Sequence, residues 1–191
     1  MDPALKPVLE REMEVYAAFM EHTDHHVGRL LDALEPVMDD TLIYLIVGDN
    51  GASAEGTLQG AFNEMANFNG MADIETPEFL VSKIDEFGGE GSYGHYAVGW
   101  AWAMDSPYQW TKQVASHWGG TRNGTIVHWP KGIDEKGGHR NQFSHVIDLA
   151  PTVLEAAGIP APTMVNGVMQ SPYEGTSMLY SFNDAEAPER H

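Results

Sequence analysis

The run Leu42–Val47 constrains the fold more than any other feature of the sequence. It is continuously apolar, contains β-branched residues and shows no alternation with polar side chains. A strand of this kind is buried on both faces, as in a parallel sheet covered by helices. The run stops abruptly at the turn-forming segment Gly48–Gly51. We therefore expect a strand over 41–47 in an α/β fold with a mainly parallel sheet flanked by helices.

Other elements follow from periodicity and capping. Apolar side chains recur at the helical period over Val8–Leu34, which predicts one long amphipathic helix. A second strand is expected over 125–129, and a helix over 148–157 that begins near Asp148 and ends at Gly158. Two strands cannot complete a sheet that buries both faces of the first, so part of the expected sheet is missing from these 191 residues.

The stretch 51–124 has a different character. It holds many of the 20 glycines, is rich in aromatic side chains and has little sustained periodicity, apart from a helix expected over 73–87. Long ordered loops in compact domains are usually functional. We therefore expect the chemistry of the chain to lie in or beside this loop.

Charge and composition exclude several classes of function. The chain has 10 Lys and Arg against 28 Asp and Glu, a formal net charge of −18. That balance argues against binding to nucleic acid or to anionic membrane surfaces. The absence of cysteine excludes disulfides, cysteine zinc sites and a thiol nucleophile within the chain. No stretch is apolar over the roughly 18 residues of a membrane span, no signal peptide is recognisable, and the compartment stays open.

Asp49 and Asn50 are the first candidate site residues. They directly follow the expected buried strand, where open α/β sheets bind their ligands, and they offer consecutive oxygen donors to a hard cation. Asp-Asn-Gly is also a favoured turn sequence, and the two interpretations weigh about equally. No nearby cluster of carboxylates supplies further ligands.

Lys112, His95 and His117 lie in the long loop. An ammonium in so acidic a chain could bind an anionic group or stabilise developing charge, although a solvated loop lysine is the more common case. Either histidine could line a pocket or act as an acid or base, although taken alone each is better explained by loop packing.

Five motifs together resemble the sulfatase family of the alkaline-phosphatase superfamily, in particular its bacterial arylsulfatase branch. In chain order they are YAAFMEHTDHHVGRLLDAL, LIYLIVGDNGASAEGTLQGAFNE, SYGHYAVGWAWAMDSPYQWTKQVASHWGGTRNG with TIVHWPKGI, HVIDLAPTVLEAAGIP, and QSPYEGTSML. The resemblance implies a mixed, largely parallel sheet between helices. It also implies hydrolysis of a small-molecule sulfate ester at a site with one divalent cation, usually Ca²⁺ and otherwise Mg²⁺.

The resemblance assigns roles to particular residues. Asp49 and Asn50 match the family's metal-ligating Asp-Asn pair, and Lys112 matches the lysine that contacts the sulfate near the leaving-group oxygen. A hard cation and an ammonium would both neutralise sulfate oxygens as charge builds up. His95 and His117 match no family catalytic residue and stay candidates for lining the substrate pocket.

The departures from the family pattern are equally informative. The family nucleophile is a formylglycine made from the first residue of a Cys/Ser-x-Pro-x-Arg motif, and this sequence contains no such motif. The paired acidic metal ligands, the supporting Arg and a Lys-x-His motif are absent too. We expect 1–182 to be a partial catalytic domain that needs the missing N-terminal part for activity, followed by a disordered acidic tail over 183–191.

Two other functions stay open from the sequence. One is hydrolysis of phosphonates or phosphate monoesters, because such enzymes of the same superfamily share the Asp-Asn pair. The other is a non-catalytic module that binds an anion or a metal. The sequence does not indicate the natural substrate or the oligomeric state.

Overall fold

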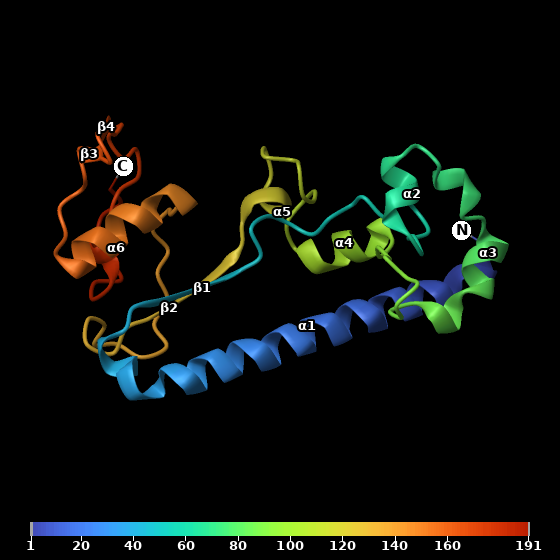
Figure 1. The fold of residues 1–191 in the computed structure, drawn as a ribbon, viewed down its shortest axis with the longest axis horizontal. Helices are drawn as coiled ribbons and strands as arrows, with labels where there is room; N and C mark the ends of the chain where they lie inside the picture. The colour runs from blue at the N-terminus through green and yellow to red at the C-terminus, as the bar shows by residue number, and fades with distance from the viewer. Residues whose placement is uncertain (1, 191) are drawn as a thin grey trace. The chain divides into compact units, whose positions relative to one another are not determined.

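The computed structural model describes residues 2–190. Met1, the first residue of the predicted domain over 1–182, and His191, the last residue of the predicted tail over 183–191, lie outside the described residues. Figure 1 shows the order of the elements along the chain. The helices are α1 (Lys6–Leu34), α2 (Glu64–Phe68), α3 (Pro77–Ser82), α4 (Val98–Asp105), α5 (Trp118–Thr121) and α6 (Leu149–Ala157). The strands are β1 (Ile43–Val47), β2 (Gly124–His128), β3 (Met164–Val165) and β4 (Val168–Met169). Short 3-10 turns lie at Pro3–Leu5, Glu35–Asp40, Ala72–Ile74, Ile84–Glu86, Val146–Asp148 and Met178–Ser181.

The chain divides into two compact units. The first comprises the chain up to Ala33 together with Leu45–Thr125, and the second comprises Leu34–Tyr44 together with the chain from Ile126 onward. The candidate site residues named above all belong to the first unit. No helix within residues 2–190 is long and apolar enough to cross a membrane.

The strands give a mixed α/β structure but not the predicted sheet. β1 and β2 are neighbours in one two-stranded sheet, and β3 and β4 form a second, antiparallel one. The mainly parallel sheet is not found in the described part of the chain. The prediction that β1 is buried on both faces is wrong in this structure, since Ile46 is 41% and Val47 51% exposed. A two-stranded sheet has too few strands to cover such a face.

The core of the first unit forms around the start of α1. Val8 and Leu80 are fully buried, and Phe62 packs edge-on against Phe87 with ring centroids 5.2 Å apart. Burying side chains of this size provides the main stabilisation of such a unit. The predicted helix over 8–34 is confirmed as α1. Val8 and Val15 pack in this core, whereas Met20 and Leu30, farther along the apolar stripe, are exposed.

Helix α4 lies within the stretch expected to be loop. Its sequence, VGWAWAMD, carries apolar residues or glycine on nearly every side. It therefore lacks the alternation of apolar and polar faces from which a helix is predicted. The indole Nε1 of Trp100 donates to the carbonyl of Leu9, 2.9 Å away, which ties α4 to α1. The helix predicted over 73–87 is shorter than expected, and α3 begins after Thr76, whose hydroxyl accepts from the Phe79 amide.

The second unit is organised by Asp148, which is 8% exposed. The side chain accepts hydrogen bonds from the amides of His145 and Thr176, both 2.7 Å away. Thr152, fully buried one turn along α6, accepts from the Met178 amide at 2.8 Å. Gly158 ends α6 in the left-handed conformation, as predicted.

The acidic stretch after Phe182 contacts the rest of the second unit. The side-chain amide of Gln142 donates to the carbonyls of Ala185 and Ala187, and the Arg190 guanidinium lies 4.5 Å from the ring centre of Tyr180. These contacts involve the residues for which the sequence predicts a disordered tail.

Glu12 is a buried acid in the first unit, 4% exposed. Its Oε2 accepts from the amide of Ala97, the residue that precedes α4. Burial raises the pKa of Glu12 to about 8; the hydrogen bond from Ala97 opposes this and the charge of Glu75 adds to it. At neutral pH the carboxyl group therefore stays protonated inside the fold.

This raised pKa predicts a pH-dependent stability. Unfolding returns Glu12 to its ordinary pKa of 4.5, so the contribution is complete below that value and is lost as the pH rises toward about 8. Each pKa unit corresponds to about 1.4 kcal/mol. We expect urea denaturation to give a free energy of unfolding that falls across this window, and Glu12→Gln to flatten the fall. Glu21→Gln, an exposed change on the same helix, should leave the slope as it is; an equal slope in all three chains would contradict the assignment.

Candidate functional site

Three sequence motifs meet in the first unit through backbone hydrogen bonds. The Gly51 amide donates to the Gly120 carbonyl at 3.1 Å, and the Lys112 amide donates to the Ala52 carbonyl at 3.0 Å. The Gly119 amide donates to the Gln109 carbonyl at 3.0 Å, which joins the start of α5 to the loop that carries Lys112. The segment after β1, the loop that carries Lys112 and the start of α5 therefore form one cluster, here called the motif cluster (48–56, 109–114 and 117–121).

Missing Cβ atoms make the motif cluster possible. A Cβ on Gly51 would overlap the carbonyl of Gly119, and one on Gly119 would overlap the carbonyl of Trp110. A Cβ on Gly120 would also lie too close to the carbonyl oxygen of Val114. These glycines are needed for the close approach of backbones rather than for a left-handed turn, because none of them has a positive φ.

The loop around Lys112 has an unusual backbone. Trp110 and Gln113 have φ values of 65° and 75°, in the left-handed region that side-chain-bearing residues rarely adopt. Thr111, between Trp110 and Lys112, is buried, and Lys112 itself is half-buried. Such strain persists only where the surroundings fix it, and it is commonest at functional sites.

The Lys112 ammonium is paired with a carboxylate that the sequence analysis did not single out. Its Nζ lies 2.7 Å from Glu55 Oε2, and the two side chains are 33% and 28% exposed. The Ser53 hydroxyl donates to the same oxygen at 2.7 Å, and Gln113 Nε2 donates to the other carboxylate oxygen at 3.0 Å. The hydrogen bond from Lys112, followed by that from Ser53, lowers the pKa of Glu55. Glu55 is therefore ionised at neutral pH.

His95 joins this group from the segment before α4. Its Nε2 lies 2.8 Å from the Ser53 hydroxyl, and its Nδ1 lies 2.8 Å from the Tyr96 carbonyl. The Tyr96 hydroxyl accepts from the Ser53 amide at 3.0 Å. Burial raises the pKa of Tyr96 to about 12, so the phenol stays neutral. A Cβ on Gly56 would strike the Tyr96 carbonyl and the His95 ring, which explains the second glycine of DNGASAEG.

His117 is near the motif cluster but outside the Glu55 group. It precedes α5, its Nδ1 lies 2.9 Å from the Ser116 hydroxyl, and its ring lies 5.9 Å from that of Trp110. Among the described residues, these are the side-chain hydrogen bond and the ring contact of His117. The structure therefore brings Lys112 and His95 together through Glu55 and Ser53, and leaves His117 apart from them.

Asp49 and Asn50 directly precede Gly51 of the motif cluster. Asp49 is exposed and Asn50 is half-buried, and within residues 2–190 neither side chain makes a hydrogen bond or ion pair. Their oxygens are free to bind a cation, but Ca²⁺ takes six or more ligands. Over the same residues no group of three or more histidines and carboxylates is placed to hold a metal. The residues present therefore offer two ligands and do not form a metal site by themselves.

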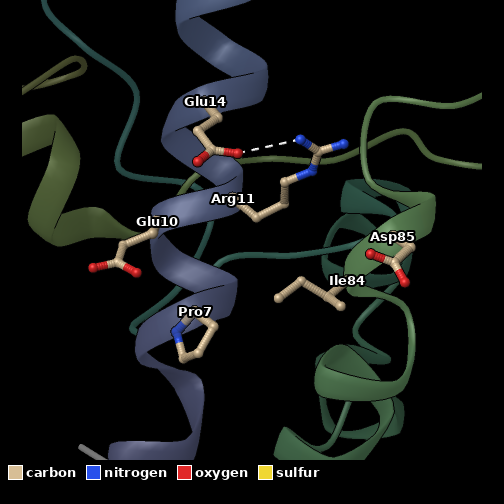
Figure 2. Close-up of a pocket in the computed structure, with 6 residues that line it drawn as sticks. All are labelled: Pro7, Glu10, Arg11, Glu14, Ile84 and Asp85. Atoms are coloured by element: carbon tan, nitrogen blue, oxygen red, sulfur yellow. Dashed lines mark hydrogen bonds and ion pairs between the residues drawn. The ribbon is translucent and has the colours of Figure 1, made fainter.

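A hollow of about 370 Å³ lies elsewhere in the first unit (Figure 2). It is lined by Pro7, Glu10, Arg11, Glu14, Ile84 and Asp85, none of which is a candidate from the sequence. Arg11 is already paired with Glu14 at 3.2 Å, as the dashed line shows. With three carboxylates around one guanidinium, this hollow does not suit an anionic substrate.

Comparison with known proteins identifies the family. The sulfatase family pattern matches residues 2–159. The chain belongs to the sulfatase family. This sulfatase chain is 30% identical over 154 residues to an uncharacterised sulfatase of Schizosaccharomyces pombe, and 29% identical over 163 residues to an arylsulfatase of Klebsiella aerogenes.

These matches cover 80% and 83% of the sulfatase chain but only 26% and 32% of the two relatives. The chain thus spans about a quarter to a third of the length of the relatives it matches. The family match includes Asp49, Asn50, His95, Lys112 and His117, together with Ser53 and Glu55. Sequence reasoning missed the last two although both stand in DNGASAEG, because their partners lie 42 and 57 positions away.

The glycine contacts predict which substitutions disrupt the site. Gly51→Ala and Gly119→Ala must push backbones apart, and overpacking of this kind typically costs about 1–3 kcal/mol. Gly28→Ala is the matched control, since nothing lies within 4 Å of the Cβ that alanine would add there in α1. The control should stabilise the helix by about 0.5–1 kcal/mol. Thermal unfolding of the three variants measures this, and equal effects at all three glycines would contradict the packing argument.

Proposed function

We propose that this chain supplies part of the active site of an arylsulfatase-type sulfuric ester hydrolase. The observation that carries the proposal is the motif cluster, in which Lys112 is held half-buried beside the segment that follows Asp49 and Asn50. Membership of the sulfatase family and similarity to an arylsulfatase support the reaction class. The substrate is a small-molecule sulfate ester.

Lys112 binds the sulfate near the leaving-group oxygen in this proposal. An ammonium has three N–H donors, and Glu55 is the carboxylate that pairs with it among residues 2–190. The remaining donors are available to sulfate oxygens. Negative charge builds up on the leaving oxygen as the S–O bond breaks, so a fixed cation stabilises the transition state more than the ground state.

Asp49 and Asn50 donate oxygen ligands to a divalent cation, Ca²⁺ or otherwise Mg²⁺. When bound, such a cation neutralises sulfate oxygens. The two side chains are free of other partners in the described structure, which leaves them available for this role. The other ligands and the formylglycine nucleophile come, in this proposal, from a further sulfatase segment that completes the catalytic domain.

His95 and His117 keep different places in the proposal. His117 lies beside Trp110 on the loop of Lys112 and can line the substrate pocket. Both ring nitrogens of His95 already have partners, Ser53 and Tyr96, so direct contact with a substrate would require one of these bonds to break.

The proposal predicts that the purified chain does not hydrolyse a chromogenic aryl sulfate or aryl phosphate, because it lacks the nucleophile motif. Calorimetry with Ca²⁺ should likewise detect no tight binding, because only two ligands are present. Turnover of either ester would contradict the proposal and would identify the sulfatase or the phosphatase alternative. Tight Ca²⁺ binding that is lost in Asp49→Ala would instead indicate a self-sufficient metal-binding module.

Binding of the anion can be tested separately from turnover. We expect weak binding of a non-hydrolysed aryl sulfate, followed by NMR or by the fluorescence of nearby Trp110, and loss of that binding in Lys112→Ala. Lys136→Ala, which removes an exposed lysine from the second unit, is the matched control and should bind normally. Equal binding by both variants would contradict the role of Lys112.

A further inference from the structure

The hydrogen bonds around Glu55 have a direction that the chemistry of the groups decides. A backbone carbonyl can only accept, so the Nδ1 of His95 carries a proton and donates it to the Tyr96 carbonyl. An ionised carboxylate can also only accept. Glu55 accepts from the Lys112 ammonium and from the Gln113 amide, and a third bond joins it to Ser53.

Ser53 has a single proton to give. Its hydroxyl donates to Glu55 Oε2 at 2.7 Å, so in its contact with His95 the Ser53 oxygen can only accept. The His95 Nε2, 2.8 Å away, is then a donor. The order of donation is His95 to Ser53 to Glu55, and Lys112 donates to the same carboxylate oxygen of Glu55 as Ser53 does.

We propose that Glu55 is the positioning residue of Lys112, and that His95 holds Glu55 in place through the Ser53 hydroxyl. The importance of this role for catalysis rests on the proposed function of Lys112. In this role His95 does not contact the sulfate; it acts on Lys112 indirectly, through Ser53 and Glu55.

The energetics favour orientation over stabilisation as the purpose of the pair. An ion pair with about a third of each side chain exposed contributes roughly 1 kcal/mol or less to stability. Lysine has a flexible four-carbon stem, so an unpaired ammonium would sample many positions. Glu55 limits that freedom, and its own carboxylate is fixed by Ser53 and Gln113.

The charged and titratable groups around Lys112 are few. Lys112 is one of 10 Lys and Arg in a chain of net charge −18, and Glu55 is its carboxylate partner. The other titratable groups near this pair are His95, Tyr96, Tyr16 and Asp105. Tyr96 is neutral, and Asp105 accepts from the Ala52 amide at 3.0 Å.

Amine acylation of the 191-residue chain, quantified by mass spectrometry, tests the proposal. An ammonium held by a carboxylate is withheld from acylation, so Lys112 should react more slowly than the exposed Lys136. Glu55→Gln should speed its acylation about two- to fivefold, the range expected for a pair of this exposure. Ser53→Ala should give part of that increase, and Ser53→Thr, which keeps the hydroxyl, should restore the original rate.

Asp40→Asn is the matched control, because it removes the carboxylate of the exposed Lys131 pair and should leave Lys112 unchanged. An unchanged Lys112 rate in Glu55→Gln, with native circular dichroism, would overturn the role of Glu55. Long-range ¹H–¹⁵N NMR of the unsubstituted chain examines His95 without relying on any variant to fold. We expect the Nε2 of His95 to carry a proton, because it donates to Ser53; an Nε2 without a proton would overturn the role of His95.

Sulfate takes no part in these measurements. A chain that fails to bind aryl sulfate contradicts the proposed function and leaves the positioning of Lys112 intact. A chain that binds aryl sulfate through Lys112 but reacts identically in Glu55→Gln contradicts the positioning alone.

Discussion

The close contact between Gly51 and Gly119–Gly120 is the interaction on which the site depends. It lets the segment after β1 lie directly against the loop of Lys112, with backbone amides and carbonyls satisfying one another. Buried backbone groups need such partners, and side chains at these positions would separate them. Everything placed by the motif cluster, including the Lys112 ammonium beside Glu55, follows from this approach of backbones. The glycines of DNG and GG are therefore structural requirements of this cluster.

Local patterns in the sequence predicted local structure well. The apolar period of α1 and the cap of α6 at Gly158 are visible in a single stretch of chain, and both are confirmed. The burial of β1 depends on neighbours that a local pattern cannot supply, which is why Ile46 and Val47 were misjudged. α4 was missed for the opposite reason: a helix that is apolar on nearly all sides has no contrast to detect.

The candidate site was predictable to a similar extent. The residue types at Asp49, Asn50 and Lys112 indicate hard-cation and anion chemistry, and the family resemblance assigns them roles that stay predictions. The link from Lys112 to His95 runs through Ser53 and Glu55 and spans most of the long loop. Only the folded backbone brings these side chains together, so sequence patterns could not reveal the link.

The exposed faces of β1 and β2 have a practical consequence for the chain in solution. Each strand has one neighbour in its sheet, and Ile46, Val47 and Ile126 present apolar side chains to solvent. Unpaired strand edges with apolar side chains promote association between copies of a chain. The net charge of −18 opposes that association by mutual repulsion. Because salt screens this repulsion, with a Debye length of about 8 Å at physiological ionic strength, the colloidal stability of the chain is governed by ionic strength as well as by its fold.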